Sequence, residues 1–286
     1  MKMNKFIPFT LNLRGEKHVF NRPLIMGILN VTPDSFYAGC RATDEEALAA
    51  RVDEIVEQGG DVIDIGAYST RPGASVVSAD EELARLCKAM TVVRARAPHV
   101  FTSVDTYRAN VAFTAISELG VDIVNDVSGG ELDEKMFATV ASLHVPYILM
   151  HMRGTPETMQ QLTQYDNVTL QVIKHLESRI KVLHEMGVSD IIADPGFGFS
   201  KTLEQNYQML AQLEQFHSLQ VPLLVGVSRK SMIYKALGST PALALNGTTA
   251  VHVLALMAGA HILRVHDVRE AVEVREILKL TADAVK

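Results

Sequence analysis

The sequence has few cysteines, no long hydrophobic run and no cluster of basic residues. Its two cysteines, Cys40 and Cys87, are too few for a disulfide framework, and neither stands in a CxxC or Cys/His spacing. The first residues also lack the basic, apolar and small-residue order of a secretory signal. A reducing, cytoplasmic location is therefore the one that the sequence predicts.

The length of the apolar stretches argues against a membrane-spanning segment, and the net charge argues against a nucleic-acid partner. The longest apolar stretch, 251–263, is interrupted by His252 and His261 and is too short to span a hydrocarbon core of about 30 Å. The net charge of −6, with no basic run between aromatic residues, argues against a nucleic-acid partner. A hydrophobic fraction of 48% over 286 residues is enough for one large domain.

Short apolar runs alternate with segments of helical periodicity along the chain. Each run ends at polar residues, glycine or proline, as expected for a parallel strand that is buried on both faces. The candidate strands are 25–30, 61–66, 101–106, 123–128, 147–151, 191–196, 223–228 and 262–267. Eight such alternations predict an α/β fold, a (β/α)8 TIM barrel with its site at the carboxyl ends of the strands.

Helices are expected between these strands. Their predicted ranges are 44–58, 80–96, 109–118, 134–143, 168–186, 204–217, 231–237, 248–258 and 268–284. Several open with a capping box, in which two side chains satisfy free N–H groups of the first turn. The pairs that fit are Thr43 with Glu46, Ser78 with Glu81, Thr202 with Gln205 and Asp267 with Glu270.

The first 22 residues fall outside the repeat. They alternate like a β-hairpin about Arg14-Gly15, and we expect this extension, 1–22, to cover the amino end of the barrel. The remaining 23–286 contain no low-complexity tract and no linker, so they are predicted to form a single barrel domain.

Four polar residues stand at the ends of different predicted strands. Asp105, Asn125, Asp194 and Lys230 are expected to meet at the mouth of the barrel. Two carboxylates, an amide and an ammonium suit a flat heterocycle, because a carboxylate accepts two parallel N–H bonds from a guanidine-like edge. The structural alternative for each aspartate is a helix cap or a pair with a neighbouring arginine.

A second set of residues indicates an anion site. Arg264 and His266 share one strand face and, with Arg71, would supply positive charge to a phosphate or diphosphate. A salt bridge at the barrel rim is the alternative for Arg264. The glycine-containing segment 196–201 lacks the third glycine of a dinucleotide-binding motif. For His151 the sequence allows two roles, support of the site residues or packing in the core.

Eight motifs occur in order, each at a predicted strand end. They are Met26-Gly-Ile-Leu-Asn-Val-Thr-Pro-Asp-Ser-Phe36, Ser69-Thr-Arg-Pro-Gly73, Ser103-Val-Asp-Thr106, Asn125-Asp-Val-Ser-Gly129, Leu149-Met-His-Met152, Asp194-Pro-Gly-Phe-Gly-Phe199, Ser228-Arg-Lys-Ser231 and Arg264-Val-His266. Together they resemble the dihydropteroate synthase family over nearly the whole chain. The order of all eight makes the resemblance specific.

The resemblance implies condensation of 6-hydroxymethyl-7,8-dihydropterin diphosphate with p-aminobenzoate by an SN1-like displacement, with Mg2+ on the diphosphate and a homodimeric enzyme. It places Asp105, Asn125, Asp194 and Lys230 at the pterin, and Thr70, Arg71, Arg264 and His266 at the anion. It implies that Asn30 contacts the Mg2+. It also implies that p-aminobenzoate is contacted by Phe36, Arg71, Pro72 and Ser231, with Phe199 near the pocket wall. Catalysis would depend on Asp105, Lys230, Arg264 and His266.

Two features depart from the family pattern. Ala67-Tyr68 stands where the family commonly has Gly-Glu, and the loop after Phe36 is slightly shorter, so loop geometry is in question. Three other functions suit the same barrel: a Schiff-base aldolase with Lys230 as the amine, a corrinoid-dependent methyltransferase, and a non-catalytic pterin-binding protein. The anion residues and both loop motifs favour the synthase over the last two.

Overall fold

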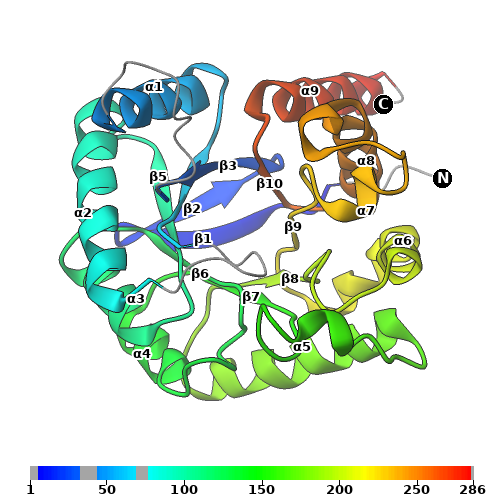
Figure 1. The fold of residues 1–286 in the computed structure, drawn as a ribbon, viewed down its shortest axis with the longest axis horizontal. Coiled ribbons are helices and arrows are strands. Elements are labelled where there is room, and N and C mark those ends of the chain that lie inside the picture. The colour runs from blue at the N-terminus through cyan, green and yellow to red at the C-terminus, as the bar shows by residue number, and fades with distance from the viewer. Residues whose placement is uncertain (1–5, 33–43, 69–76, 285–286) are drawn as a thin grey trace.

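The computed structural model describes residues 6–32, 44–68 and 77–284, which form a barrel of parallel strands inside a ring of helices (Figure 1). The strands are β3 Leu24–Asn30, β4 Val62–Gly66, β5 Phe101–Asp105, β6 Ile123–Asp126, β7 Tyr147–Met150, β8 Ile191–Asp194, β9 Leu224–Val225 and β10 Ile262–Val265. Their order is β8-β7-β6-β5-β4-β3-β10-β9, and a parallel bridge between Ala193 and Leu223 joins the two edges. The predicted (β/α)8 barrel is confirmed.

The helices follow the strands as predicted, with differences at their ends. They are α1 Asp44–Glu57, α2 Ala79–Arg96, α3 Ala109–Ser117, α4 Met136–Leu143, α5 Val168–Glu185, α6 Leu203–Ala211, α7 Ser231–Tyr234, α8 Leu245–Met257 and α9 Val268–Asp283. The single helix predicted over 204–217 is wrong, because α6 ends at Ala211 and a 3-10 helix, Leu213–Leu219, follows. In the described part of the chain, each helix is too short or too polar to cross a membrane.

Two of the predicted helix caps have the expected side-chain hydrogen bond, and one does not. Thr202 and Gln205 form a complete capping box, and the Ser78 side chain accepts from the backbone N–H of Glu81. The cap predicted at Asp267 is wrong, because its carboxylate instead accepts two hydrogen bonds from Arg229, at 2.7 and 2.9 Å. Thr43 lies outside the described residues.

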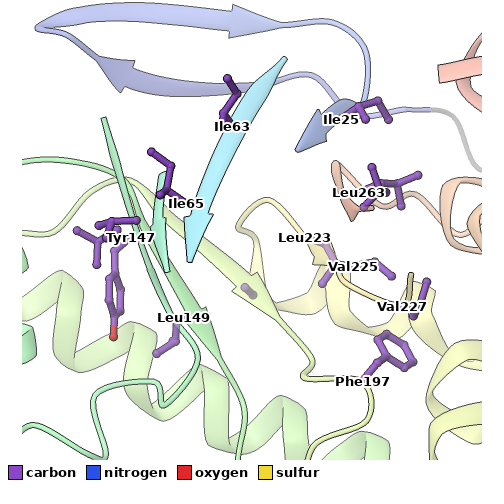
Figure 2. Close-up of a cluster of buried hydrophobic side chains, with 14 of the residues drawn as sticks. Ile25, Ile63, Ile65, Tyr147, Leu149, Phe197, Leu223, Val225, Val227 and Leu263 are labelled. Atoms are coloured by element: carbon purple, nitrogen blue, oxygen red, sulfur yellow. The ribbon is translucent and has the colours of Figure 1, made fainter. Parts of the chain in front are cut away.

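Alternate residues of each strand pack into separate apolar layers. One set faces the helices, and Figure 2 shows Ile25, Ile63 and Leu263 among its buried side chains. The intervening residues form a second cluster inside the barrel: Leu24, Met26, Val62, Ile123, Ile148, Ile192, Leu224 and Ile262. This alternation is the period of two that a pleated strand imposes on its side chains.

An antiparallel hairpin covers the amino end of the barrel. It consists of β1 Phe9–Leu13 and β2 Glu16–Phe20, and its turn places Arg14 and Gly15 at φ 55° and 79°, as a tight two-residue turn requires. Phe9, Leu11 and Leu13 are buried in the inner cluster. The hairpin, dark blue in Figure 1, therefore seals the amino end and leaves the carboxyl end for polar groups.

We expect the hairpin to contribute substantially to stability. Leu11→Ala should lower the free energy of unfolding by about 2–5 kcal/mol, because Leu11 is 1% exposed and its truncation leaves a cavity. Val19→Ala, on the same hairpin but 59% exposed, should change it by no more than about 0.5 kcal/mol. Urea unfolding measures both, and equal midpoints for the two variants would contradict the sealing role.

Candidate active site

Polar residues follow the inner apolar layer at the next inward positions of the same strands. Because side chains alternate along a strand, a residue two positions after an inward apolar residue also points toward the barrel axis. The pairs are Val62 with Asp64, Ile123 with Asn125, Ile192 with Asp194 and Ile262 with Arg264. The site is therefore stacked directly on the barrel core.

Arg264 binds two carboxylates at the centre of this polar layer. Its Nε donates to Asp64 Oδ2 at 2.6 Å, and its Nη2 donates to Asp105 Oδ2 at 2.7 Å. Asn125 Nδ2 lies 3.2 and 3.3 Å from the two oxygens of Asp64. Burial opposes the guanidinium charge, but Asp64 and Asp105 raise the pKa of Arg264 above its ordinary value. The salt bridge considered for Arg264 therefore exists, and it lies inside the site.

Asp105 lies at the end of β5 with one oxygen on Arg264. Its other oxygen is 3.4 Å from the Tyr68 hydroxyl, a long hydrogen bond. Burial raises the pKa of Asp105 to about 7, and Asp64 adds to the rise, while Arg264 opposes it. The carboxyl group therefore exchanges its proton close to neutral pH.

Asp194 and Lys230 form the opposite side of the site. The backbone N–H of Gly196 donates to Asp194 Oδ1 at 2.8 Å. Lys230 Nζ donates to the Phe197 carbonyl at 2.5 Å and lies 4.6 Å from the centroid of the Phe199 ring. Burial lowers the pKa of Lys230 to about 8, and Asp194 opposes that shift, so most of Lys230 is an ammonium at pH 7.

Gly226 marks an open space between these groups. A Cβ atom placed on Gly226 would lie 3.8 Å from Arg264 Cβ, 3.9 Å from Lys230 Nζ and 4.0 Å from Asp194 Oδ2. A side chain at this position would occupy the space that the three residues share. We call this point above Gly226, where the three residues meet, the slot; the acceptor of Asp194 and the donor of Lys230 there suit one edge of a flat polar heterocycle.

His266 contributes a neutral ring to the site. Its backbone N–H donates to Ser228 Oγ at 3.1 Å, and its Nδ1 lies 3.0 Å from the same oxygen. Because Ser228 Oγ accepts from the backbone, its hydroxyl proton can go to Nδ1, which leaves the ring proton on Nε2. Burial, followed by the charge of Arg264, lowers the pKa of His266 to about 4. The expected positive charge on His266 is therefore corrected to a neutral donor at pH 7.

The structure brings most of the predicted site residues together. Asp105, Asn125, Asp194, Lys230, Phe199, Arg264 and His266 lie around the polar layer through the contacts above. Ser231 begins α7, next to Lys230. Asn30 ends β3, and a Cβ on Gly66 would lie 3.3 Å from its Oδ1 and 3.9 Å from Asp105 Cβ. Phe36, Thr70, Arg71 and Pro72 lie outside the described residues.

Asp64 is the site residue that sequence reasoning missed. It is 0% exposed and bonds to both Arg264 and Asn125. The sequence did contain a sign of this role, because Asp64 is a charged residue within the otherwise apolar run 62–65. It stands two residues after Val62 and so points to the same face of the strand. Such a carboxylate needs a buried partner, since burying it alone is costly.

Metal ligands are sparse among the described residues. No group of three or more His, Cys, Asp or Glu side chains in 6–32, 44–68 and 77–284 could hold a metal ion. Asn30 offers one amide oxygen beside the site, and an oxygen ligand suits a hard cation such as Mg2+. The amide oxygen of Asn30 thus fits one ligand position of such an ion.

Comparison with known proteins gives a consistent result. The pattern of the family described as "Pterin binding enzyme" matches residues 26–266. A dihydropteroate synthase from Escherichia coli is 40% identical over 274 residues, which are 95% of this chain and 96% of the relative.

Solved structures agree with this relationship. A Xanthomonas albilineans dihydropteroate synthase with 4-aminobenzoic acid superposes with a TM-score of 0.88 at 36% identity, covering 96% of this chain and 99% of that one. The dihydropteroate synthase of the same organism in complex with 7,8-dihydropteroate has a TM-score of 0.85 at 34% identity, with the same coverage of 96% and 99%.

The arrangement of carboxylates predicts a specific effect of Asp64. Asp64→Asn should lower the pKa of Asp105 below about 7, because the charge of Asp64 helps to raise it and Arg264 would then serve Asp105 alone. Carbon-13 NMR titration of the Asp105 carboxyl measures the shift. Glu185→Gln, at a side chain 66% exposed, should leave it unchanged. An unchanged or higher pKa in Asp64→Asn would contradict the coupling.

Proposed function

The chain belongs to the family of pterin-binding enzymes, and from this membership we infer that it catalyses the dihydropteroate synthase reaction. It joins p-aminobenzoate to 6-hydroxymethyl-7,8-dihydropterin diphosphate and releases diphosphate, a transferase step of folate biosynthesis. The observation that carries this inference is the polar layer itself: Arg264 binds Asp105 and shares Asp64 with Asn125, while Asp194 and Lys230 meet Arg264 at the slot.

The slot is chemically matched to a pterin. Asp194 uses Oδ1 for the Gly196 N–H, and its Oδ2 faces the open space above Gly226, where it can accept from the guanidine-like edge of the ring. The Lys230 ammonium offers donors to ring oxygen or nitrogen atoms, and Asn125, whose Nδ2 donates to Asp64, offers its Oδ1 as an acceptor. These residues form the pterin pocket of the proposed enzyme.

The proposed reaction breaks the bond between the pterin methylene carbon and the diphosphate oxygen. The electron pair leaves with the diphosphate, and the positive charge on the methylene spreads over the pterin ring. The Asp105 carboxylate stabilises this cation, while Arg264 and the Nε2–H of His266 face the departing anion. The lone pair of the arylamine nitrogen then forms the new bond to the methylene carbon, and the resulting ammonium loses a proton to solvent.

We propose Mg2+ as the ion that accompanies the diphosphate. Asn30, at the end of β3, would supply an oxygen ligand, and the remaining ligands would be diphosphate oxygens and water. When bound, the ion would neutralise charge on the leaving group. The support from this chain is the amide oxygen of Asn30 beside the polar layer.

A homodimer in the cytoplasm is the proposed state of the enzyme. Large apolar side chains stay exposed on and before α8 and on α9: Leu237, Leu243, Leu254, Ile277 and Leu280. Such exposure supports an interface between two copies. Light scattering should give about twice the chain mass of 31.4 kDa, and Leu243→Glu, at 74% exposure, should reduce it to the monomer. A monomeric wild type would contradict the dimer.

Diphosphate release separates the proposed function from its rivals. Release should require both p-aminobenzoate and the pterin diphosphate, and the product should be 7,8-dihydropteroate. A methyltransferase would instead act on a methylated corrinoid, and a binding protein would hold the pterin without release. An aldolase would leave a borohydride-trapped adduct on Lys230, which we do not expect, because Lys230 Nζ donates to the Phe197 carbonyl and lies against the Phe199 ring.

Removing the charge of Asp105 should reduce turnover. Asp105→Asn should lower kcat by about 10²-fold, roughly 2.7 kcal/mol, because a neutral amide cannot stabilise the developing cation. Calorimetry should still show pterin binding, since Asp194 and Lys230 are intact. Wild-type turnover in Asp105→Asn would disprove this role, and Glu185→Gln is the control at an exposed carboxylate.

The pH profile provides a second measurement of the same role. Asp105 is active when ionised, and burial raises its pKa to about 7. For wild type, kcat/KM should therefore fall as the pH decreases through about 7. In Asp105→Asn this acidic limb should disappear. An acidic limb that persists unchanged would assign the titration to another group.

A further inference from the structure

A buried lysine outside the proposed reaction contacts a segment that borders the site. Lys201 is 3% exposed, and its Nζ makes three close contacts. It donates to the carbonyl oxygens of Gly196 and Phe199, both at 2.9 Å, and lies 3.0 Å from Nδ1 of His151. None of these contacts involves the slot above Gly226, so Lys201 requires its own explanation.

The surroundings of Lys201 match an ammonium group. An ammonium has three N–H donors, and the two carbonyls and His151 Nδ1 are three acceptors. Burial lowers the pKa of Lys201 well below its ordinary value, and the carboxylate of Asp194 opposes this shift. Burial and then the charge of Lys201 lower the pKa of His151, which keeps its ring neutral and able to accept.

Lys201 fastens a segment with an unusual backbone. Gly196, Gly198 and Ser200 have φ values of 69°, 83° and 51°, so three alternate residues lie in the left-handed region. For Ser200 that conformation is unfavourable, and surrounding contacts must hold it. The Ser200 side chain exchanges hydrogen bonds of 2.9 Å with the backbone of Arg153, on the loop after β7.

The same segment forms one wall of the pterin pocket. The carbonyls of Gly196 and Phe199 bind Lys201, whereas the carbonyl of Phe197, between them, accepts from Lys230 at 2.5 Å. The Phe199 ring stands 4.6 Å from Lys230 Nζ. Three of the carbonyls of this short segment are thus divided between two lysines: those of Gly196 and Phe199 bind Lys201, and that of Phe197 binds Lys230 in the site.

We propose that Lys201 is a positioning residue of the pterin pocket: together with His151 it fixes the segment 196–200, and the segment in turn holds Lys230 beside the slot. The assignment rests on the proposed function, because the pocket is taken to bind a pterin. Lys201 touches no substrate in this account. It acts through the Phe197 carbonyl and the Phe199 ring.

The test measures pterin binding in a matched set of variants. The probe is 6-hydroxymethylpterin, which occupies the pterin pocket without diphosphate or p-aminobenzoate, and calorimetry of the full-length protein gives Kd. Lys201→Met removes the three donors and keeps the aliphatic stem. His151→Leu removes the acceptor, whereas His151→Asn retains an oxygen close to the Nδ1 position. Lys181→Met, at a side chain 78% exposed, is the control.

Lys201→Met and His151→Leu should each raise Kd by about ten-fold, because buried carbonyls or donors lose their partners and the segment shifts. His151→Asn should recover most of this loss. In turnover, the KM for the pterin diphosphate should rise by about the same factor, while kcat changes much less, since Asp105 and Arg264 are untouched. Lys181→Met should match wild type.

Three results separate the possible failures. Wild-type Kd in a folded Lys201→Met would overturn the positioning role. Equal Kd values for His151→Asn and His151→Leu would also overturn it, because ring packing would then matter and the hydrogen bond would not. If Lys201→Met does not fold, the comparison of His151→Asn with His151→Leu still tests the positioning role. Absence of pterin binding by wild type would instead overturn the proposed function.

Discussion

The partly buried guanidinium of Arg264, 20% exposed, constrains the rest of the site. A charge at this depth is tolerated only with close partners, and Asp64 and Asp105 supply them from two neighbouring strands. With Asp194 and Lys230 added, three carboxyl groups face two basic side chains, so acidic groups outnumber basic ones in the site. Such a site favours a developing cation on the pterin. It disfavours a free diphosphate, which is why the proposed Mg2+ matters.

The barrel core and the site share the same strands and the same face. Inward positions near the amino end carry Val62 and Ile262, and the next inward positions carry Asp64 and Arg264. The apolar layer below is sealed by the hairpin through Leu11. The polar groups on the strands are therefore held on a rigid base, and strand register sets their separations, whereas Lys230 lies after β9 and contacts the segment 196–200.

The fold and the strand-end residues were predictable because both depend on local pattern. Apolar runs located the strands, and the polar residues after them located Asp105 and Asp194 in the site. Asp64 was missed because attention to strand ends overlooks a carboxylate within a strand. The neutral state of His266 depends on its burial and on Arg264, which only the assembled barrel provides. The prediction of a helix cap at Asp267 was wrong for a similar reason, because the partner of its carboxylate, Arg229, lies 38 residues away in the sequence.

Burial shifts the two titrating groups of the site toward the same pH. Desolvation raises the pKa of Asp105 to about 7 and lowers that of Lys230 to about 8, so both lie close to losing their charge. A flat ligand that enters the slot removes more water and pushes both shifts further, unless it returns hydrogen bonds to the charged forms. Only a ring with N–H donors toward Asp105 and acceptors toward Lys230 does so. A ring with the reverse pattern would favour the neutral forms of both groups, so the desolvation that weakens the charges also works against such a ligand.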